Sequence, residues 1–529
     1  MAFAARSSNR PYLKFADFAD RLSGPGRRFV AEHSEGAIVF AALAAFVVIW
    51  TLYDNISLAS VDVHFDVSEA TLWAQHFAFG YKHPPLVAWI FSLWFAVFPN
   101  RDWAADLLTV TVIAAGLAIT WRLLRDHLDK NRALFGLIAL VLIPFYDIKT
   151  AILNTNTVLI PFWAAALLFY LRARRTLRIS DAFLAGAFAS LTVLGKYWGV
   201  FLLAGMAIAS IAGSDTRRFW RSPAPYVMAA GAVIVIAPHV WWYVSEGGGA
   251  NYAFVRDTVV LKLSLGAALL RSAHYLISAV AYVIAPLILL VALRPSNAAL
   301  ADIVWPAEPD RRQALLLFVV PLLLPALVNL AIPYRLTDDW TYPNWALLPV
   351  VLYGARDLAI DERAVARAGL VAFAVAAIAL AVSPVVAYAR LLRGQDQYRT
   401  HFRQVAELGD QLMGQPVRLF WGSYDITSGL PFYLPRAQPL SVDPLSAEGR
   451  AAAKVHGLLI VCVSDDVGCR TTAAALAATG ATTTSVTFTR RFAGFSGPPM
   501  SFQVTVVPAA QAGTAATPGS TLSTDSDRS

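Results

Sequence analysis

The segment Asp66–Trp89, DVSEATLWAQHFAFGYKHPPLVAW, sets two acids, two histidines, a lysine and a pair of prolines between long apolar stretches. Titratable side chains are costly to place near a membrane, so they usually mark a working site. The apolar run that follows, 85–98, is too short for an ordinary membrane span and is typical of an interfacial or re-entrant helix. The topology of the chain depends on whether this run crosses the membrane.

Three basic segments favour one answer: 122–132, 172–178 and 215–221. If 85–98 crossed, all three would lie outside the cell. If it does not cross, all three lie in the cytoplasm, as the positive-inside rule favours. We therefore predict that residues 54–104 form one external segment of short helices that lie along the membrane.

The composition supports a membrane protein. The chain has 529 residues, of which 57% are hydrophobic and only 15% are charged, whereas soluble domains carry about 25% charge. The formal net charge of +8 does not indicate nucleic acid, because Lys and Arg concentrate in the cytoplasmic loops of membrane proteins. We predict a polytopic α-helical membrane protein with roughly eleven spans, at 37–53, 105–124, 133–149, 157–171, 181–195, 198–213, 225–243, 269–293, 314–332, 343–354 and 367–390.

The chain divides into four parts by composition. Residues 1–36 are predicted to be a basic cytoplasmic arm, and 37–394 the transmembrane domain. Residues 395–510 are predicted to form a small α/β domain on the external face, and 511–529 a disordered tail. The external domain is expected to have helices at 451–454 and 471–478 and strands at 417–421, 457–463, 485–492 and 500–507.

The chain has two cysteines, Cys462 and Cys469, and their spacing is not a zinc or redox motif. If this region is exported, a disulfide that closes a small loop is expected, because disulfides persist in oxidising compartments. Two free buried thiols are the alternative.

With this topology the unusual polar residues gather on the external side. Lys196 lies in LTVLGKYWGVFLL, where an ammonium needs a partner or a ligand. We interpret it as a cation for a phosphate; the alternative is a lysine that snorkels to the interface. Arg335 is a second candidate cation, and its alternative is an ion pair with Asp338 or Asp339.

Asp66 and Glu69 are three residues apart, so on a helix both would project from one face. One of them is a candidate general base that takes a proton from an attacking hydroxyl. Alternatively, Asp66 is the N-cap of a helix and Glu69 completes a capping arrangement. Aromatic side chains near these positions fit sugar rings and prenyl chains, but an interfacial aromatic belt predicts them equally well.

Motifs for nucleotides and metals are absent from the sequence: there is no Walker loop, no G-x-G-x-x-G after a strand and no H-E-x-x-H. If the chain is a transferase, we do not expect its donor to be a soluble nucleotide sugar in a Rossmann-like domain. We expect no cofactor and no metal.

Several motifs occur together in a fixed order: Asp66/Glu69, GYKHPPL (80–86), LNTNTVLIP (153–161), GAFASLTVLGKYWG (186–199) and PHVWW (238–242). In this order and spacing the chain resembles the polyprenyl-phosphate-sugar-dependent glycosyltransferases of the GT-C class. These include protein O-mannosyltransferases and the aminoarabinose transferase of lipid A. The chain looks most similar to the branch with rhizobial lipopolysaccharide galacturonosyltransferases.

The resemblance implies a transferase of the bacterial inner membrane whose active site opens to the periplasm. The donor would be a sugar on a polyprenyl phosphate, the acceptor a lipid or glycan such as lipid A or core oligosaccharide, and transfer would invert the anomeric carbon. Asp66 or Glu69 would activate the acceptor hydroxyl. The implied donor-phosphate ligands are Lys82, Lys196 and Arg335, and the implied substrate contacts are Tyr81, His83, Asn156, Tyr197, His239 and Trp340.

Two departures from the family pattern keep alternatives open. Relatives commonly have adjacent Asp-Glu where this chain has Ser68-Glu69, so either Asp66 or Glu69 is the base. Asn156 stands where many relatives carry Asp. A transporter or flippase of lipid-linked glycans is the alternative function, and a non-catalytic protein that binds a partner through 395–510 is a third. The identities of the sugar and the acceptor do not follow from the sequence.

Overall fold

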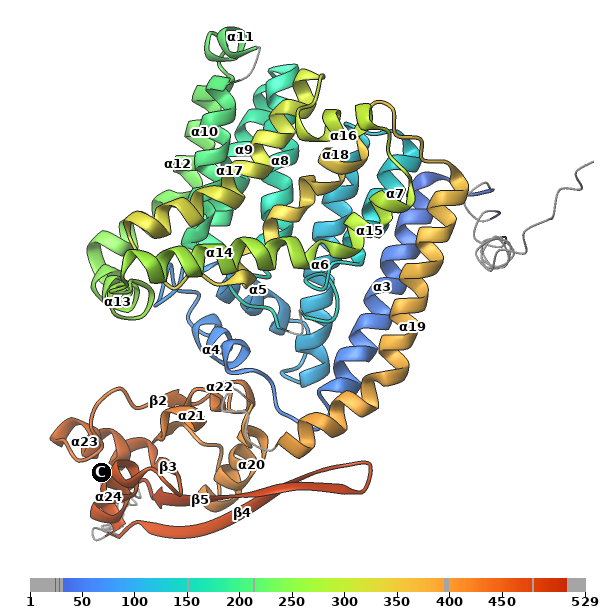
Figure 1. Ribbon diagram of the computed structural model, residues 1–529. Helices are drawn as coiled ribbons and strands as arrows, with labels where there is room; N and C mark the ends of the chain where they lie inside the picture. Colours follow the sequence, from blue (N-terminus) through green and yellow to red (C-terminus); the bar gives the residue numbers. More distant parts are fainter. Residues whose placement is uncertain are drawn as a thin grey trace, which may run out of the picture. The chain divides into compact units, whose positions relative to one another are not determined.

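The computed structural model describes Gly24, Arg28 and residues 32–510, except 150–151, 213–214, 394–398 and 478–479. Most of the basic arm and the tail 511–529 lie outside the described residues. The chain forms two compact units, Met1–Thr400 with Arg490–Pro498, and His401–Thr489 with Pro499–Ser529. We name them the helical unit and the C-terminal unit and describe each by itself (Figure 1). The four-part division by composition stays a prediction.

The helical unit consists of helices joined by short loops. Its elements are α3 (Glu35–Ser57), α4 (Phe65–Ala74), α5 (Leu86–Phe95), α6 (Asp102–Arg125), α7 (Lys130–Val141), α8 (Leu159–Thr176), α9 (Ile179–Gly195), η1 (Tyr197–Gly199), α10 (Val200–Ala212), α11 (Thr216–Trp220), α12 (Ala224–Trp242), η2 (Tyr243–Gly247), α13 (Gly248–Phe254), η3 (Val255–Val259), α14 (Leu265–Tyr282), α15 (Ile284–Ala292), α16 (Asn297–Val304), α17 (Pro309–Ala331), η4 (Asp338–Leu347), α18 (Leu348–Tyr353) and α19 (Glu362–Arg393).

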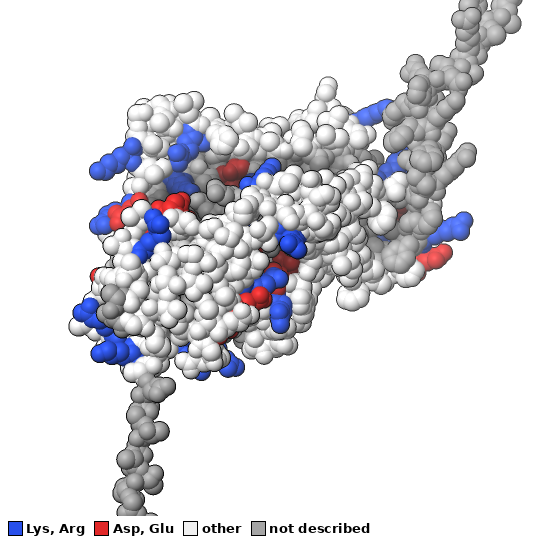
Figure 2. Space-filling view, turned by 90° about the horizontal axis from the view of Figure 1, so that it is seen from below, with Lys and Arg blue, Asp and Glu red and all other residues white. Residues whose placement is uncertain are grey.

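Within the described residues, five helices are long and apolar enough to cross a membrane: α3, α6, α12 extended to Ser245, α17 and α19. The pair α14 and α15, bent by 49°, makes a sixth if it is one broken span. Large apolar side chains such as Val233, Ile277 and Phe373 are more than 60% exposed on these helices, which indicates a surface that faces lipid. On the face drawn in Figure 2, charged side chains gather in a few groups among uncharged residues.

The chain is therefore a polytopic helical membrane protein, as predicted from its composition. The predicted apolar runs coincide with helices of the structure, but several of these helices are shorter than an ordinary span. The total of eleven spans stays a prediction.

Small residues allow α9 and α12 to pack closely. A Cβ atom on Gly186 would lie 1.8 Å from the carbonyl oxygen of Met228, and one on Gly231 would lie 2.5 Å from that of Phe183. The Ser190 hydroxyl donates to the Ala232 carbonyl at 2.8 Å between the same helices. Small residues of this kind let backbones approach in membrane proteins, where packing and hydrogen bonds drive helix association.

The segment after α3 contains two short helices, α4 and α5, each of 10 residues. The N-cap of α4 is His64, whose Nδ1 accepts from the Asp66 backbone N–H at 3.2 Å. The alternative that made Asp66 the N-cap is therefore wrong, because Asp66 lies inside the first turn. Short helices were predicted for 54–104, and the side of the membrane on which they lie stays a prediction.

The C-terminal unit contains a sheet in the order β2-β1-β3-β5-β4, in which β1 pairs parallel with β2 and β3 while β5 runs antiparallel to β3. All six residues of the central strand β3 are buried, as expected of a strand covered on both faces. The elements of this region are α20 (Phe402–Met413), β1 (Leu419–Gly422), α21 (Tyr424–Thr427), α22 (Leu430–Tyr433), β2 (Gln438–Pro439), α23 (Ala447–His456), β3 (Leu458–Val463), α24 (Val467–Ala477), β4 (Thr482–Phe492) and β5 (Phe495–Val507).

The four predicted strands and both predicted helices of this region are present, as β1, β3, β4, β5, α23 and α24. Helices α20, α21 and α22 and the two-residue strand β2 were not predicted. Helix α20 is strongly amphipathic, with Phe402, Val405 and Ala406 buried in the core. Its apolar positions at helical spacing were the signal that was overlooked.

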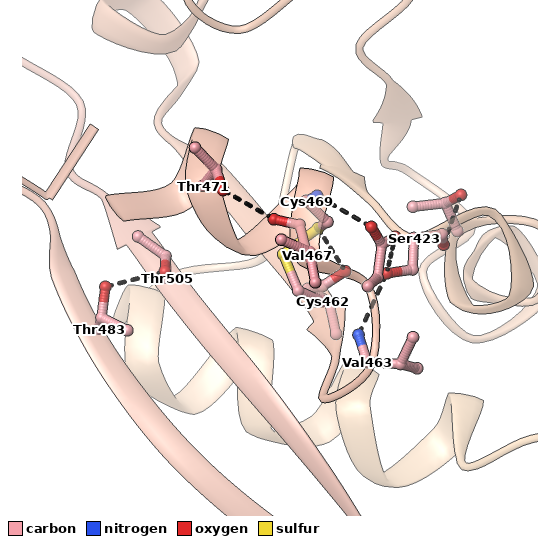
Figure 3. The surroundings of a disulfide bond; sticks show 11 residues. Ser423, Cys462, Val463, Val467, Cys469, Thr471, Thr483 and Thr505 are labelled. Atoms are coloured by element: carbon pink, nitrogen blue, oxygen red, sulfur yellow. Dashed lines mark hydrogen bonds between the residues drawn. A yellow bond between two sulfur atoms is a disulfide. The ribbon is translucent and has the colours of Figure 1, made fainter. Parts of the chain in front are cut away.

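Cys462 on β3 and Cys469 on α24 form a disulfide with a Cα–Cα distance of 5.6 Å (Figure 3). The turn between them is also held by Asp466, whose carboxylate accepts from the Cys469 backbone N–H at 2.9 Å and from the Ser423 hydroxyl at 2.7 Å. The Ser423 oxygen in turn accepts from the Val463 N–H at 3.1 Å. The disulfide and this network together fix the start of α24 on the sheet.

Replacing both cysteines by alanine is expected to destabilise the packing of α24 on the central strand β3. A disulfide that closes so short a loop contributes about 2–3 kcal/mol by limiting the unfolded chain. Hydrogen exchange of the full-length protein should show faster exchange for peptides from β3 and α24, and reductant should produce the same change in the wild type. Thr471→Ser, on the same helix, is the control. Unchanged exchange in the double variant would contradict the expectation.

Candidate active site

Helix α4 carries both candidate acids, and the structure ties one of them to a lysine. The Glu69 carboxylate lies 2.7 Å from Lys82 Nζ, and the two side chains are 19% and 28% exposed. Burial raises the pKa of Glu69, and the charge and hydrogen bond of Lys82 offset part of that rise. Glu69 and Lys82 thus form a largely buried ion pair that connects α4 to loop 75–85.

Asp66 belongs to a chain of contacts that leads to Lys196. Asn154 donates its amide to the Asp66 carboxylate at 3.2 Å, while its side-chain oxygen accepts from the backbone N–H of Asn156 at 2.9 Å. This Asx turn holds Asn156, whose oxygen accepts from Lys196 Nζ at 2.6 Å. The LNTN turn therefore places the Asn154 amide N–H at Asp66 and the Asn156 side-chain oxygen at Lys196.

Lys196 is placed by the end of α9. The helix stops at Gly195, and Lys196 takes an extended conformation that turns its side chain toward Asn156. Its Nζ also lies 3.9 Å from the centre of the Trp340 ring, a cation–π contact. Burial lowers the pKa of Lys196, and the charges of Asp339 and Asp66 offset part of this. The ammonium binds groups inside the protein, which disfavours snorkelling.

The GYKHPPL segment is fixed against α12 and α13. A Cβ atom on Gly80 would lie 2.2 Å from the Trp242 ring, so only glycine permits this approach. Asn251 on α13 donates to the carbonyls of Tyr81 and Lys82 at 3.2 and 2.9 Å. The backbone on both sides of the Lys82 side chain is therefore held from a second part of the helical unit.

His239 of α12 connects this segment to η1. Its Nδ1 lies 2.7 Å from the Phe79 carbonyl, which can only accept, so Nδ1 carries the proton. Its Nε2 therefore accepts from the Tyr197 hydroxyl at 3.0 Å. Burial raises the pKa of Tyr197 to about 12, so this hydroxyl keeps its proton. Tyr197 and His239 thus hold the backbone at Phe79, the residue before the GYKHPPL segment.

The rings of Tyr81 and His83, both in the GYKHPPL segment, pack against neighbouring aromatic side chains. Tyr81 stacks on Trp73 with centroids 5.0 Å apart, and His83 packs edge-on against Phe254 at 5.1 Å. Burial, together with the charges of Lys82 and Lys196, lowers the pKa of His83 to about 3. His83 is therefore neutral at physiological pH and does not add a positive charge to the site.

A second ion-pair group is formed by Lys149 with Asp338 and Asp339, which precede Trp340 in the sequence of η4. Lys149 Nζ is 2.6 Å from Asp339 and 3.4 Å from Asp338, and Lys149 and Asp338 both contact the Tyr282 hydroxyl. Three charged residues in polar loops were visible in the sequence, but their mutual contact depends on how loop 142–149 meets η4. Because of this contact, Asp338 and Asp339 of η4 form their ion pairs with Lys149.

Replacing Lys149 by Met is expected to lower kcat/KM about tenfold. This loss corresponds to a coupling free energy of about 1.4 kcal/mol between Lys149 and Asp339. Asp339, once released from Lys149, is free to pair with Lys196 and would compete with a bound phosphate. Asp339→Asn added to Lys149→Met should restore most of the lost activity, and the KM for the lipid donor should carry the change. A double variant no more active than Lys149→Met would contradict this account.

Arg335 lies apart from the contacts that join the other predicted site residues. Its side chain is exposed, and its backbone N–H donates to the Val259 carbonyl at 2.7 Å. In the described part of the chain, Asp338 and Asp339 pair with Lys149 and not with Arg335. The alternative that paired Arg335 with these acids is therefore wrong, and a role of Arg335 toward phosphate stays a prediction.

Most of the remaining predicted residues belong to sets of direct contacts. Glu69 binds Lys82, and Asp66 is connected to Lys196 and Trp340 through the LNTN turn. Both acids lie on α4, which Figure 1 shows next to α5. Carboxylates suited to take a proton lie beside two ammonium groups suited to hold a phosphate. Asn154 and Asn251, which position these groups, were not among the predicted site residues.

Comparison with known proteins addresses the fold first. The crystal structure of ArnT from Cupriavidus metallidurans bound to undecaprenyl phosphate matches with a TM-score of 0.61 and 12% identity, over 89% of this chain and 98% of that chain. The fold is that of the GT-C glycosyltransferases. The apo structure of the same ArnT matches with a TM-score of 0.55 and 14% identity, over the same shares of the two chains.

The sequence of the chain is similar to glycosyltransferases over part of its length. Residues 82–242 match the family described as dolichyl-phosphate-mannose-protein mannosyltransferase. The lipid A galacturonosyltransferase RgtD of Rhizobium johnstonii is 24% identical over 297 residues, which are 55% of this chain and 59% of that protein. The match thus spans less than two thirds of this curated relative. The resemblance to the GT-C class that was predicted from the motifs is confirmed.

Proposed function

We propose that this chain is an integral-membrane glycosyltransferase that moves a sugar from a polyprenyl-phosphate carrier to an envelope lipid or glycan. The observation that carries the proposal is the site itself. Asp66 and Glu69 project from the first turns of α4, and the LNTN turn connects Asp66 to Lys196. An acid for the acceptor and cations for the leaving phosphate are what this reaction needs.

The proposed step is a single displacement. The acceptor hydroxyl attacks the anomeric carbon from the face opposite the phosphate, and the carbon–oxygen bond to the phosphate breaks. The hydroxyl proton passes to Asp66 or Glu69, and the polyprenyl phosphate leaves with the electron pair of the broken bond. The anomeric configuration is inverted, because one bond forms as the opposite bond breaks.

The two lysines act on the leaving group. Lys196 now binds Asn156 and Trp340, and Lys82 binds Glu69, so a donor phosphate would replace or share these partners. Charge that develops on the phosphate is stabilised best by groups already in place in a dry site. Because these lysines supply the positive charge, the proposal includes no metal and no organic cofactor.

The relatives support a lipid-linked donor and a lipid acceptor. ArnT was crystallised with undecaprenyl phosphate, and RgtD is named for its action on lipid A. We propose by this likeness that the chain lies in a bacterial inner membrane, with its N-terminus in the cytoplasm and its site and C-terminal unit in the periplasm. Lipid A and core oligosaccharide are the proposed acceptors, and the sugar is left open.

The test compares envelope glycolipids by mass spectrometry. One set of cells carries the wild-type chain and the other carries Asp66→Asn with Glu69→Gln, which removes the base whichever acid it is. We expect one glycolipid to lose one sugar mass in the double variant. Asp357→Asn with Glu362→Gln, which neutralises two exposed acids elsewhere, should leave the glycolipids unchanged.

The opposite result would reject the proposal. An unchanged glycolipid profile in the double variant, with the protein present at wild-type level in the membrane, would favour a transporter or flippase of lipid-linked glycans. Movement of a labelled lipid-linked glycan by purified protein in vesicles, without a covalent product, would then identify that activity.

A further inference from the structure

A cavity of about 390 Å³ lies in the helical unit between α8, α9, α10, α11 and α12. Its wall includes Tyr170, Gly186, Met206, Trp220, Met228 and Ala232. Small residues create the space: Gly186 lets α9 approach α12, and three alanines of α10 and α12 leave room beside it. The volume is within the range of about 300–1,000 Å³ that is usual for ligand sites.

The polar groups of this wall are already bonded within the protein. The Tyr170 hydroxyl donates to the Met206 carbonyl at 2.9 Å, and the Ser210 hydroxyl donates to the Ala207 carbonyl at 2.7 Å. The Ser210 carbonyl accepts from Trp220 Nε1 at 3.2 Å and from Arg174 at 3.3 Å. The cavity therefore offers contacts to hydrocarbon and few polar groups to a ligand.

Three arginines adjoin the cavity in the sequence, next to the lining residues Phe219 and Trp220. The short helix α11 places Trp220 in the wall and carries Arg217 and Arg218, and Arg221 follows at its end; all three arginines are exposed. Phe219 anchors α11, since it is buried and stacks under the Arg174 guanidinium at 4.5 Å. Among the described residues, none of the three exposed arginines has an acidic partner in an ion pair.

This cavity is separate from the proposed donor site. Helix α12 begins with Ala224 next to α11 and ends at Trp242 beside Gly80, and its 19 residues span roughly 28 Å. Figure 1 shows α11 and α13 at opposite ends of α12. That length is close to the hydrocarbon thickness of a bilayer, about 30 Å. Helix α11 and the Gly80 segment therefore lie at opposite ends of a helix that is long enough to cross a membrane.

We propose that this cavity binds an anionic glycerophospholipid, with an acyl chain in the apolar space and the headgroup phosphate at Arg217, Arg218 and Arg221. Exposed apolar side chains around it, such as Ile211 and Val233 at 66% and 62% exposure, place it on a lipid-facing surface. An uncharged apolar groove with cations at one end complements a lipid that has a chain and a negative phosphate. The site does not depend on the proposed transferase activity.

The test measures lipid retention by full-length protein. Purified protein, stripped of lipid in detergent, is titrated with phosphatidylglycerol and with phosphatidylcholine of the same acyl chains, and bound lipid is counted by native mass spectrometry. We expect one tight site that prefers phosphatidylglycerol at least tenfold. Arg217→Ala with Arg218→Ala and Arg221→Ala should remove the preference, and Ala207→Phe, which fills the cavity, should weaken retention of both lipids.

The control variant removes three exposed arginines elsewhere, Arg363, Arg450 and Arg470, and should keep the preference. Thermal unfolding and gel filtration of each variant show whether it is folded. Equal retention of the two lipids by the wild type would overturn the proposal, as would an unchanged preference in the folded triple α11 variant. Tighter binding of undecaprenyl phosphate than of phosphatidylglycerol at this site would also overturn it and assign the cavity to the carrier lipid.

Discussion

Asp66→Asn is expected to lower kcat for sugar transfer by about 10²–10⁴-fold, the usual contribution of a general base. The amide keeps the size of the side chain, so Asn154 can still contact it, but it cannot accept a proton. We favour Asp66 over Glu69 as the base because Glu69 is bound to Lys82 at 2.7 Å, whereas Asp66 is held by a neutral amide at 3.2 Å. The ion pair with Lys82 occupies the Glu69 carboxylate, whereas the contacts of Asp66 are the Asn154 amide and His64 Nδ1 at 3.7 Å.

Glu69→Gln is expected to act differently. It releases Lys82, so the change should appear mainly in the KM for the lipid donor. The two variants, assayed with purified protein and a lipid-linked donor, therefore separate the roles. If Glu69→Gln lost kcat and Asp66→Asn did not, the assignment would be reversed.

The pH profile gives a second measurement of the same assignment. A base must be deprotonated to work, so activity falls as pH drops through its pKa. Burial raises the pKa of Glu69. If Glu69 were the base, the acidic limb would lie above the ordinary glutamate value of about 4.3. If Asp66 is the base, the acidic limb of the wild-type profile should be unchanged in Glu69→Gln, whereas if Glu69 is the base that limb should be lost.

Lys196→Met is the second large effect, with an expected loss of about 10²–10³-fold in kcat/KM, as for removal of one oxyanion-stabilising donor. Methionine keeps the apolar contact with Trp340 but has no charge for the leaving phosphate. The variant should also bind undecaprenyl phosphate more weakly, and a purely structural role would not produce that result in a folded protein.

The control for Lys196 is Lys262→Met, which removes an exposed lysine and should leave transfer unchanged. The charge of Lys196 is present below its pKa and is lost above it. Burial lowers that pKa, so an alkaline limb is expected below the ordinary lysine value of about 10.4. Wild-type affinity for undecaprenyl phosphate in Lys196→Met would reject the phosphate role.

Much of the fold followed from local patterns. The apolar runs located the helices, because a helix that faces lipid must be apolar along its whole length. The continuous apolar run GLLIVCV located β3, and the short run at 85–98 located α5. Helix α20 was missed although its pattern was present, and β2 was missed because two residues carry no pattern.

The site was predicted residue by residue but not as a set of contacts. Lys196 and the acids on α4 stood out because charge is rare in such surroundings. The ion pair of Glu69 with Lys82 and the placement of Arg335 apart from the cluster could not be read from spacing, since they depend on how loops from distant helices meet.

The sequence by itself determined that this protein is a helical membrane protein with a GT-C-like set of motifs, because solvent preference and motif order are local properties of the chain. Only the tertiary structure decided that Lys149 neutralises Asp339 while Lys196 turns to Asn156. It also decided that Cys462 meets Cys469 beside Asp466, and that Phe219 and Trp220 of α11 line an apolar cavity. Such pairings depend on distances between segments far apart in sequence, and those distances exist only once the helices have packed.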